Sequence, residues 1–176
     1  MKRLIWLLAA TAGLVLAQDK QAPASTNVEF TVYLISGSAQ GTADEVPKDL
    51  ESTVRQLHSV FAYKSYKLSE SFILRGGAGM ASTEGVIPVV GLRYRFGYFR
   101  FRLLGDPPRA VQLEALYLEL TRPTVGLKDG KQIYETVAKI NTNLDMRDGQ
   151  KIVVGKSSLN IGGDALILVI VPRVIE

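Results

Sequence analysis

The chain has 176 residues, with 21 basic and 17 acidic side chains, one histidine and no cysteine. Its formal charge is +4, and the +2 that remains without the basic residues at positions 2 and 3 is too balanced to indicate a polyanionic partner by itself. Without cysteine there is no disulfide framework, so the fold must depend on its apolar core.

The first residues have the pattern of a secretory signal. Lys2 and Arg3 precede an apolar run, residues 4–16, that closes in a small-residue cleavage pattern at Ala17. The run has about 13 residues, fewer than the roughly 20 of a membrane-spanning helix. We expect a signal peptide over residues 1–17 and export to the periplasm or outer membrane. Removing Lys2 and Arg3 leaves 19 basic residues and a formal charge of +2.

A strand, a helix and a second strand are predicted next. Residues 18–27 are polar and are interpreted as a flexible lead. Residues 28–36 alternate, which predicts a strand with one apolar face made of Val28, Phe30, Val32 and Leu34. From Pro47 the period changes to that of a helix, whose apolar stripe is Leu50, Val54, Leu57 and Phe61. Residues 63–74 alternate again, with a predicted apolar face of Tyr66, Leu68, Phe72 and Leu74.

The remainder is predicted to be all-β. Residues 75–85 are rich in glycine and are predicted to be a turn region, near which any boundary between a module at 28–74 and an all-β portion at 86–176 would fall. Five further strands are predicted at 91–104, 111–120, 133–144, 150–159 and 165–174. The expected fold class is α+β, a strand-helix-strand layer followed by a mostly antiparallel β-sandwich-like half, with a single domain containing both parts as an alternative.

Gly155-Lys156-Ser157 matches the end of a phosphate-binding P-loop. That motif needs a compact, glycine-rich loop before its lysine, but Gly149 lies one residue too early. The intervening residues include Ile152, Val153 and Val154, which favour a strand. We therefore predict a strand at this place, no bound nucleotide and no cofactor.

Residues 91–103 interleave basic and aromatic side chains, a composition that nucleic-acid binders also use. The RNA-recognition signature requires a glycine after its leading basic residue, where this chain has Phe96 after Arg95. We expect a strand bulged at Gly97, with the aromatic residues in the core and the arginines in solvent, and no nucleic-acid partner. The alternative is an anion-binding surface for a glycan or lipopolysaccharide, made by Arg93, Arg95, Arg100 and Arg102.

Recognisable catalytic and metal-binding patterns are missing from the sequence. His58 is the only histidine and lies at the edge of the helical stripe, where we expect a boundary residue rather than a zinc ligand. The carboxylates are scattered, and Asp148-Gly149 is typical of a tight hairpin turn. Ser157 lacks the Gly-x-Ser-x-Gly context of a hydrolase nucleophile. We expect no enzymatic activity and no metal.

Two patches resemble secretins. Residues 148–155, DGQKIVVG, resemble a strand-turn-strand of that family, and residues 164–171, DALILVIV, resemble the strand that follows it. Residues 28–74 also resemble the strand-helix-strand core of the periplasmic ring-building modules that secretins carry. The resemblance does not extend to the pore, because the chain is too short for the family's membrane-spanning hairpins. It implies a subunit or accessory protein of an envelope assembly, associating through sheet edges and the helix face.

The sequence thus favours a non-enzymatic exported envelope protein that acts through protein–protein contacts, with other envelope proteins or with itself. Residues 149–158 would form one strand of a hairpin. Lys151 and Lys156 would face solvent there and keep the exposed sheet edge from pairing with a wrong partner. The alternative function is binding of an anionic envelope ligand by the four arginines. Salt distinguishes the two, because binding through arginines weakens as ionic strength rises and an apolar contact does not.

Overall fold

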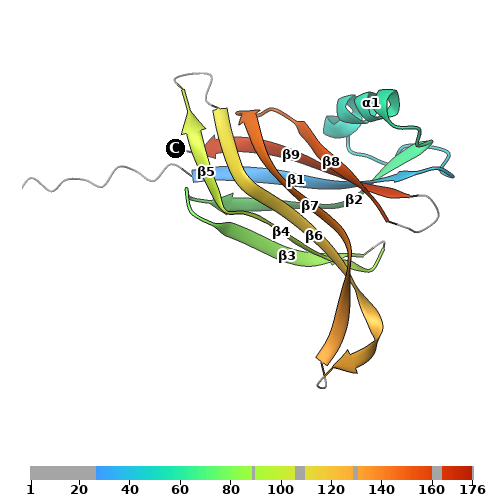
Figure 1. Ribbon diagram of the computed structural model, residues 1–176. Helices are drawn as coiled ribbons and strands as arrows, with labels where there is room; N and C mark the ends of the chain where they lie inside the picture. The colour runs from blue at the N-terminus through green and yellow to red at the C-terminus, as the bar shows by residue number, and fades with distance from the viewer. Residues whose placement is uncertain (1–26, 89, 106–109, 129–130, 160–163, 176) are drawn as a thin grey trace, which may run out of the picture.

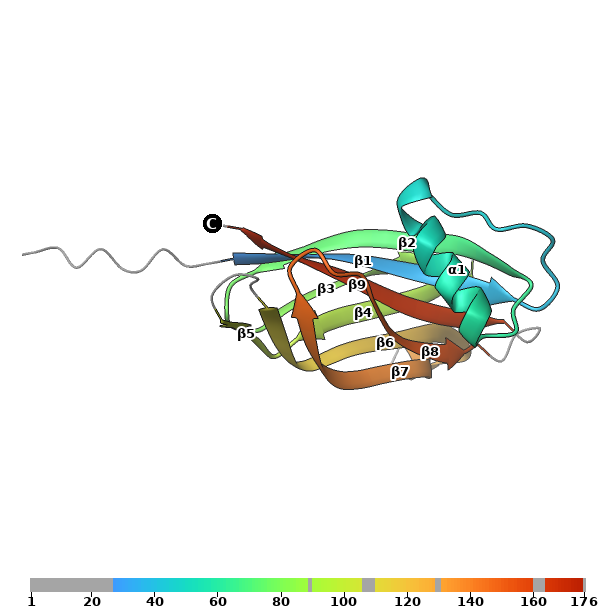
Figure 2. The same ribbon diagram turned by 90° about the horizontal axis from the view of Figure 1, so that it is seen from above.

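The computed structural model describes residues 27–88, 90–105, 110–128, 131–159 and 164–175. Two antiparallel sheets pack face to face in it, and one short helix lies on the outside of one sheet (Figures 1 and 2). The expected signal peptide, and the expected flexible lead up to residue 26, lie outside the described residues.

Sheet A joins the two ends of the described chain. Its strand order is β2-β1-β9-β8, with bounds β1 Asn27–Ser38, β2 Ser65–Gly76, β8 Ile152–Ser158 and β9 Ala165–Ile175. All of its strand pairs are antiparallel. The strand-helix-strand segment therefore does not form a layer of its own, because β1 pairs with β9 from the end of the chain.

Sheet B contains the middle of the chain. Its strands are β3 Ala81–Ile87, β4 Leu92–Tyr98, β5 Arg100–Leu104, β6 Ala110–Lys128 and β7 Lys131–Arg147. β4 and β5 pair with successive parts of β6, and β7 pairs with β6. β3 pairs with β4, and β7 is the strand of sheet B that precedes β8 of sheet A.

The main core lies between the sheets. Val28, Phe30, Val32 and Leu34 are fully buried there, which confirms the apolar face predicted for the first strand. Aromatic rings of the two sheets meet edge to face, as Phe30 of β1 does with Tyr98 of β4 at a centroid distance of 5.3 Å. Alternation along each strand thus gives each sheet one apolar face. Burial of these two faces against each other drives the packing of the two sheets into a sandwich.

A second, smaller core lies under the helix. The 3₁₀ helix η1, Lys48–Leu50, runs into α1, Glu51–Val60, and Leu50, Val54 and Leu57 are buried against the outer face of sheet A. This confirms the predicted helical stripe, whose last member, Phe61, follows the end of α1 and packs against the same core. Because both faces of sheet A are covered here, β9 is apolar almost continuously, with Ala165, Leu166, Ile167, Leu168, Val169 and Ile170 buried.

The single apolar face predicted for residues 63–74 is wrong. The pairing register of β2 with β1 shifts by one residue, so that Leu34 faces Glu70 and Ile35 faces Leu68. Ser69 is the extra residue of this bulge, and a one-residue slip sends side chains to the other face. Tyr66 and Leu68 accordingly pack under the helix, whereas Phe72 and Leu74 pack between the sheets.

Three turn predictions also need correction. The glycine-rich turn region is shorter than expected, since β3 begins at Ala81. The residue that changes the alternation near Gly97 is Phe99, which separates β4 from β5 and is 60% exposed. Asp148-Gly149 does not close a hairpin, because β7 belongs to sheet B and β8 to sheet A. Gly149, with φ of 72°, turns the chain from one sheet to the other.

Candidate functional site

The outer face of sheet B is the polar side of the sandwich. Strand alternation places Arg93 and Arg95 of β4 on it, beside Thr121 and Glu119 of β6 in the neighbouring register positions. Lys139 of β7 follows beside Glu119. Arg93, Arg95, Arg100 and Arg102 are all exposed, which confirms that the arginines of this segment face solvent.

Arg95 lies between two carboxylates. In register it faces Glu84 of β3 on one side and Glu119 of β6 on the other. The guanidinium of Arg95 is 3.9 Å from one carboxylate oxygen of Glu119, and the other oxygen of Glu119 accepts a hydrogen bond from the Thr136 hydroxyl at 3.1 Å. Arg95 therefore has Glu119 as an ion-pair partner and the carboxylate of Glu84 opposite it in register.

Arg100 and Arg102 share one carboxylate, that of Glu114. Two nitrogens of Arg100 donate to the same Glu114 oxygen, at 2.7 and 3.1 Å, and Arg102 lies 3.2 Å from the other oxygen. The hydrogen bond from Arg100 lowers the pKa of Glu114, aided by the positive charges of Arg100 and Arg102 and opposed by partial desolvation. This group carries one negative and two positive charges.

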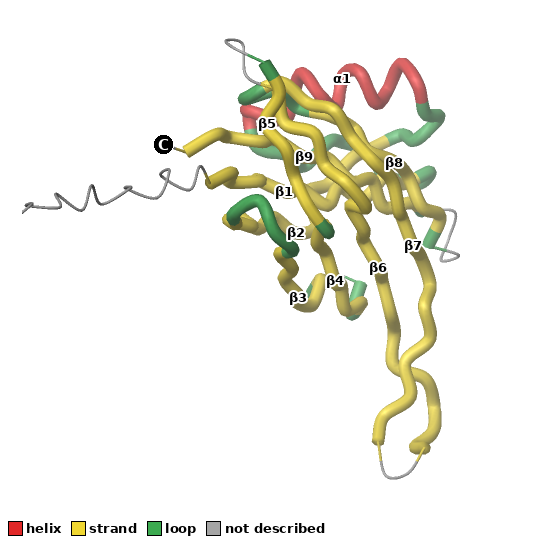
Figure 3. Tube along the Cα trace, turned by 60° about the vertical axis from the view of Figure 1, so that its left-hand side comes forward, coloured by secondary structure: helices red, strands yellow, loops and turns green. Residues whose placement is uncertain are grey.

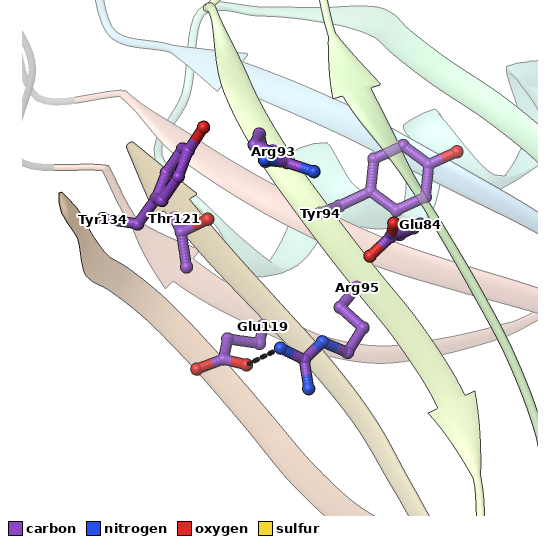
Figure 4. A pocket seen from close by; sticks show the side chains of 7 residues that line it. All are labelled: Glu84, Arg93, Tyr94, Arg95, Glu119, Thr121 and Tyr134. Carbon is purple, nitrogen blue, oxygen red and sulfur yellow. Dashed lines mark ion pairs between the residues drawn. The ribbon is translucent and has the colours of Figure 1, made fainter. Parts of the chain in front are cut away.

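Arg93 lies over an aromatic ring. Its guanidinium carbon is 5.0 Å from the ring centroid of Tyr134 on β7, a cation–π distance. Arg93, Tyr134 and the Arg95–Glu119 ion pair line a hollow of about 190 Å³, which Glu84, Tyr94 and Thr121 complete (Figure 4). Strands β3, β4, β6 and β7 all contribute to this hollow.

A second hollow of about 350 Å³ adjoins the first, since both are lined by Arg95 and Glu119. It has an apolar side formed by Met80, which is 73% exposed, and Phe99, which is 60% exposed. Large apolar side chains exposed together on a charged sheet face are unusual and often mark a contact surface. The two hollows together form one shallow groove, which we call the sheet B groove.

Tyr117 forms part of the second hollow and lies across β4. Gly97 is its register partner, and a Cβ at Gly97 would lie 2.8 Å from the Tyr117 hydroxyl oxygen. Only a residue without a side chain leaves room for the phenol there. Next to Tyr117, the backbone N–H of Ala115, which has a φ of 49°, donates to the Asn143 side-chain oxygen at 2.8 Å.

Lys151 and Lys156 lie elsewhere, beside the helix on sheet A. The ammonium of Lys151 contacts the backbone oxygen of Asp49 and lies 3.5 Å from its carboxylate. That of Lys156, on β8, is 3.2 Å from the Tyr63 hydroxyl and 5.6 Å from the Phe61 ring centroid. The six residues proposed from sequence thus divide into an arginine set on sheet B and a lysine pair on sheet A.

The candidate catalytic and P-loop residues have structural partners. Lys156 and Ser157 lie within β8, which confirms a strand where the P-loop ending occurs. Nε2 of His58 donates to a carboxylate oxygen of Asp44 at 2.9 Å, and the His58 ring packs edge to face on Tyr66. In the described parts of the chain, no group of three or more His, Asp or Glu side chains is placed to hold a metal ion, and no helix has the length and hydropathy to span a membrane.

A long hairpin extends away from the sandwich (Figures 1 and 3). Of the described residues, those of β6 beyond Thr121 pair only with β7, so residues 122–128 and 131–135 form a two-stranded extension, here called the arm. Arg122 and Glu135 form an ion pair across its base at 3.1 Å. Val125, Ile133 and Tyr134 are its exposed apolar side chains.

Sequence reasoning did not identify the arm or the sheet B groove. The strand predicted to end at residue 120 continues through Pro123 and Gly126 to Lys128, and the exposure of Phe99 depends on where β4 ends. The change of alternation after Tyr98 was the one available sign that Phe99 leaves the core. The glutamates that pair with the arginines are remote in sequence, and sheet register alone brings them together.

The chain is similar to several solved structures, although no family model and no curated protein matches it. The Salmonella SPI-1 type III secretion injectisome secretin InvG is 12% identical, with a TM-score of 0.45 over 86% of this chain and 65% of that chain. Aeromonas hydrophila ExeD is 12% identical, with a TM-score of 0.43 over 85% of this chain and 48% of that chain. The type II secretin GspD of enteropathogenic Escherichia coli is 13% identical, with a TM-score of 0.40 over 86% of this chain and 69% of that chain.

Two of these structures are named as secretins, the family that the two sequence patches resemble. The chain spans 65% of the InvG chain and about half of the ExeD chain.

Proposed function

We propose that the protein is a non-enzymatic, exported component of a cell-envelope assembly, and that it associates with further copies of itself through the arm. The observation that carries the proposal is the arm itself, a hairpin that leaves the sandwich with exposed apolar side chains. The secretin-like patches at residues 148–155 and 164–171 suggest the class of assembly.

An isolated two-stranded hairpin is marginally stable in water, because it has no second layer to pack on. In the arm, Val125 is 108% exposed, and Ile133 and Tyr134 are 40% and 42% exposed. Both strand edges of the arm also offer backbone groups for pairing with another chain. A neighbouring subunit that packs on the arm would bury Val125 and Ile133 and pair those edges, while Tyr134 stays against Arg93.

Two contacts within the hairpin and one contact to β4 order the arm. The Gln132 amide donates to the carbonyl oxygen of Thr124, and Arg122 pairs with Glu135. The ring of Tyr134 rests against Arg93 of β4. Because these contacts set the direction of the arm before any partner binds, they reduce the ordering cost of association.

Substitutions on the arm test the proposal. In the double variant Val125→Ser/Ile133→Ser, the apolar contact is removed while the strands and the ion pair at the base remain. Sedimentation equilibrium should show dissociation at concentrations at least about tenfold above those of the unchanged chain. The matched control is Ile73→Ser on sheet A, which removes an apolar side chain that is 60% exposed outside the arm. Equal association of all three chains would contradict a role for the arm.

A further inference from the structure

We propose that the sheet B groove binds a neutral oligosaccharide. The groove crosses the outer face of sheet B from Met80 and Phe99 at one end to Tyr134 at the other, with the Arg95–Glu119 pair between them. Along β4, the distance from Arg93 to Phe99 is about 20 Å at the usual strand rise. This length fits several linked sugar rings better than a single one.

The apolar side chains of the groove lie where a sugar ring could pack. Phe99 and Met80 are more than half exposed, and Tyr117 lies over the space left by Gly97. A pyranose ring presents C–H bonds on its faces, and these pack on aromatic and thioether surfaces. Burial in the sandwich does not explain this exposed set, since the core residues of β4 point to the opposite face.

The charges of the groove favour a ligand without charge. Its five described charged side chains are Glu84, Glu119, Arg93, Arg95 and Lys139. Arg95 is flanked by both glutamates, and Glu119 is flanked by Arg95 and Lys139. An anionic ligand would have to compete with these carboxylates for Arg95, and with the Tyr134 ring for Arg93. Paired carboxylate and guanidinium groups instead offer acceptors and donors side by side, which suits neighbouring sugar hydroxyls.

The backbone of the groove favours a sugar over an extended peptide. A peptide that adds to a sheet gains affinity from main-chain hydrogen bonds at a free edge. Around Arg95, β4 pairs with β3 on one side and with β6 on the other, and β6 pairs in turn with β7. Recognition on this face therefore depends on side chains. A ligand rich in hydroxyl groups can form more hydrogen bonds with these side chains than an extended peptide can.

Calorimetric titration of the mature chain with cellotetraose and with the tetrasaccharide of β-1,4-linked N-acetylglucosamine tests the inference. One of these sugars should bind, and the affinity should change little with salt. Phe99→Ala should weaken binding by about tenfold. The matched control is Leu104→Ala, an apolar residue of β5 that is 41% exposed and does not line the groove, and it should bind as the unchanged chain does.

The inference would be overturned by no heat from either sugar at millimolar concentration, by equal affinity in Phe99→Ala, or by tighter and salt-sensitive binding of a galacturonate oligomer. Stronger binding of a decapeptide containing phenylalanine and aspartate would likewise identify a peptide surface instead. The arm variant Val125→Ser/Ile133→Ser should bind sugar normally. A failure of assembly and a failure of sugar binding are thus separate results.

Discussion

Tyr117 lies across the neighbouring strand at the position of Gly97, so closely that a Cβ on Gly97 would lie 2.8 Å from the phenol oxygen. The same Cβ would come within 2.5 Å of the backbone oxygen of Ala81 on β3. Three strands of sheet B thus approach one another at a single glycine. This packing keeps the Tyr117 ring on the outer face, next to Phe99 and Met80.

Gly97→Ala should therefore destabilise the protein by about 1–3 kcal/mol, because the backbone of β3 cannot move aside as a flexible side chain could. Urea denaturation measures the change in the free energy of unfolding. Gly79→Ala is the control, since a Cβ there meets nothing within 4 Å and its effect should stay within about 0.5 kcal/mol. Equal stability of Gly97→Ala and the unchanged chain would contradict the tight approach.

The core under the helix should respond strongly to truncation. Leu57 is 2% exposed and packs on sheet A, so Leu57→Ala should cost about 2–5 kcal/mol of unfolding free energy. Val60, near the end of the same helix, is 71% exposed, and Val60→Ala should have an effect within about 0.5 kcal/mol. A small loss in Leu57→Ala, measured by the same denaturation, would mean that the helix is not firmly docked.

Asp44 is expected to fix the loop before the helix to β2. Its carboxylate accepts the backbone N–H of Tyr66 at 2.8 Å and contacts His58 with its other oxygen. Asp44→Ala should speed hydrogen exchange at the Tyr66 amide and destabilise the fold by about 1 kcal/mol. Glu45→Gln removes only the exposed ion pair with Lys67 and should leave that exchange rate unchanged. Unaltered exchange in Asp44→Ala would argue against the anchoring role.

Glu114 should make stability depend on pH in the acid range. The hydrogen bond from Arg100 lowers the pKa of Glu114 in the folded state. Glu114 therefore contributes to folding stability when the pH is above the ordinary pKa of a glutamate carboxyl group, about 4.3. That contribution is lost as the pH falls through the lowered pKa. The difference in Tm between the unchanged chain and Glu114→Gln should accordingly shrink from neutral to acid pH. In an Arg100→Gln/Arg102→Gln background the difference should no longer vary with pH, and a persistent variation would implicate other groups.

Local periodicity was enough to predict those elements in which pairing with a neighbouring strand does not interrupt the spacing of the apolar residues. β1 and the helix follow from alternation and from a 3.6-residue stripe, and their buried faces were predicted correctly. The bulge at Ser69 could not be predicted, because a polar residue on an alternating strand gives no sign of a register shift set by β1. β3 was missed because its sequence, ASTEGVI, has a weak apolar face and an internal glycine.

The arm and the groove depend on pairing between distant strands. Pro123 and Gly126 normally interrupt strands, but register shifts between Pro123 and Leu127 accommodate them in the hairpin. The exposure of the arginines was predictable from alternation, whereas their glutamate partners were not. Glu114 and Glu119 belong to β6, and only the register of sheet B places them beside β4 and β5.

The solution mass of a chain that begins at Gln18, as the expected cleavage after Ala17 would leave it, tests the central claim most directly. Light scattering behind a sizing column should be recorded at low and high salt. Association through the apolar arm predicts a mass of several protomers at both salt concentrations, because apolar contacts are not screened. A monomer at both salt concentrations, or an oligomer that dissociates as salt is added, would contradict assembly through the arm.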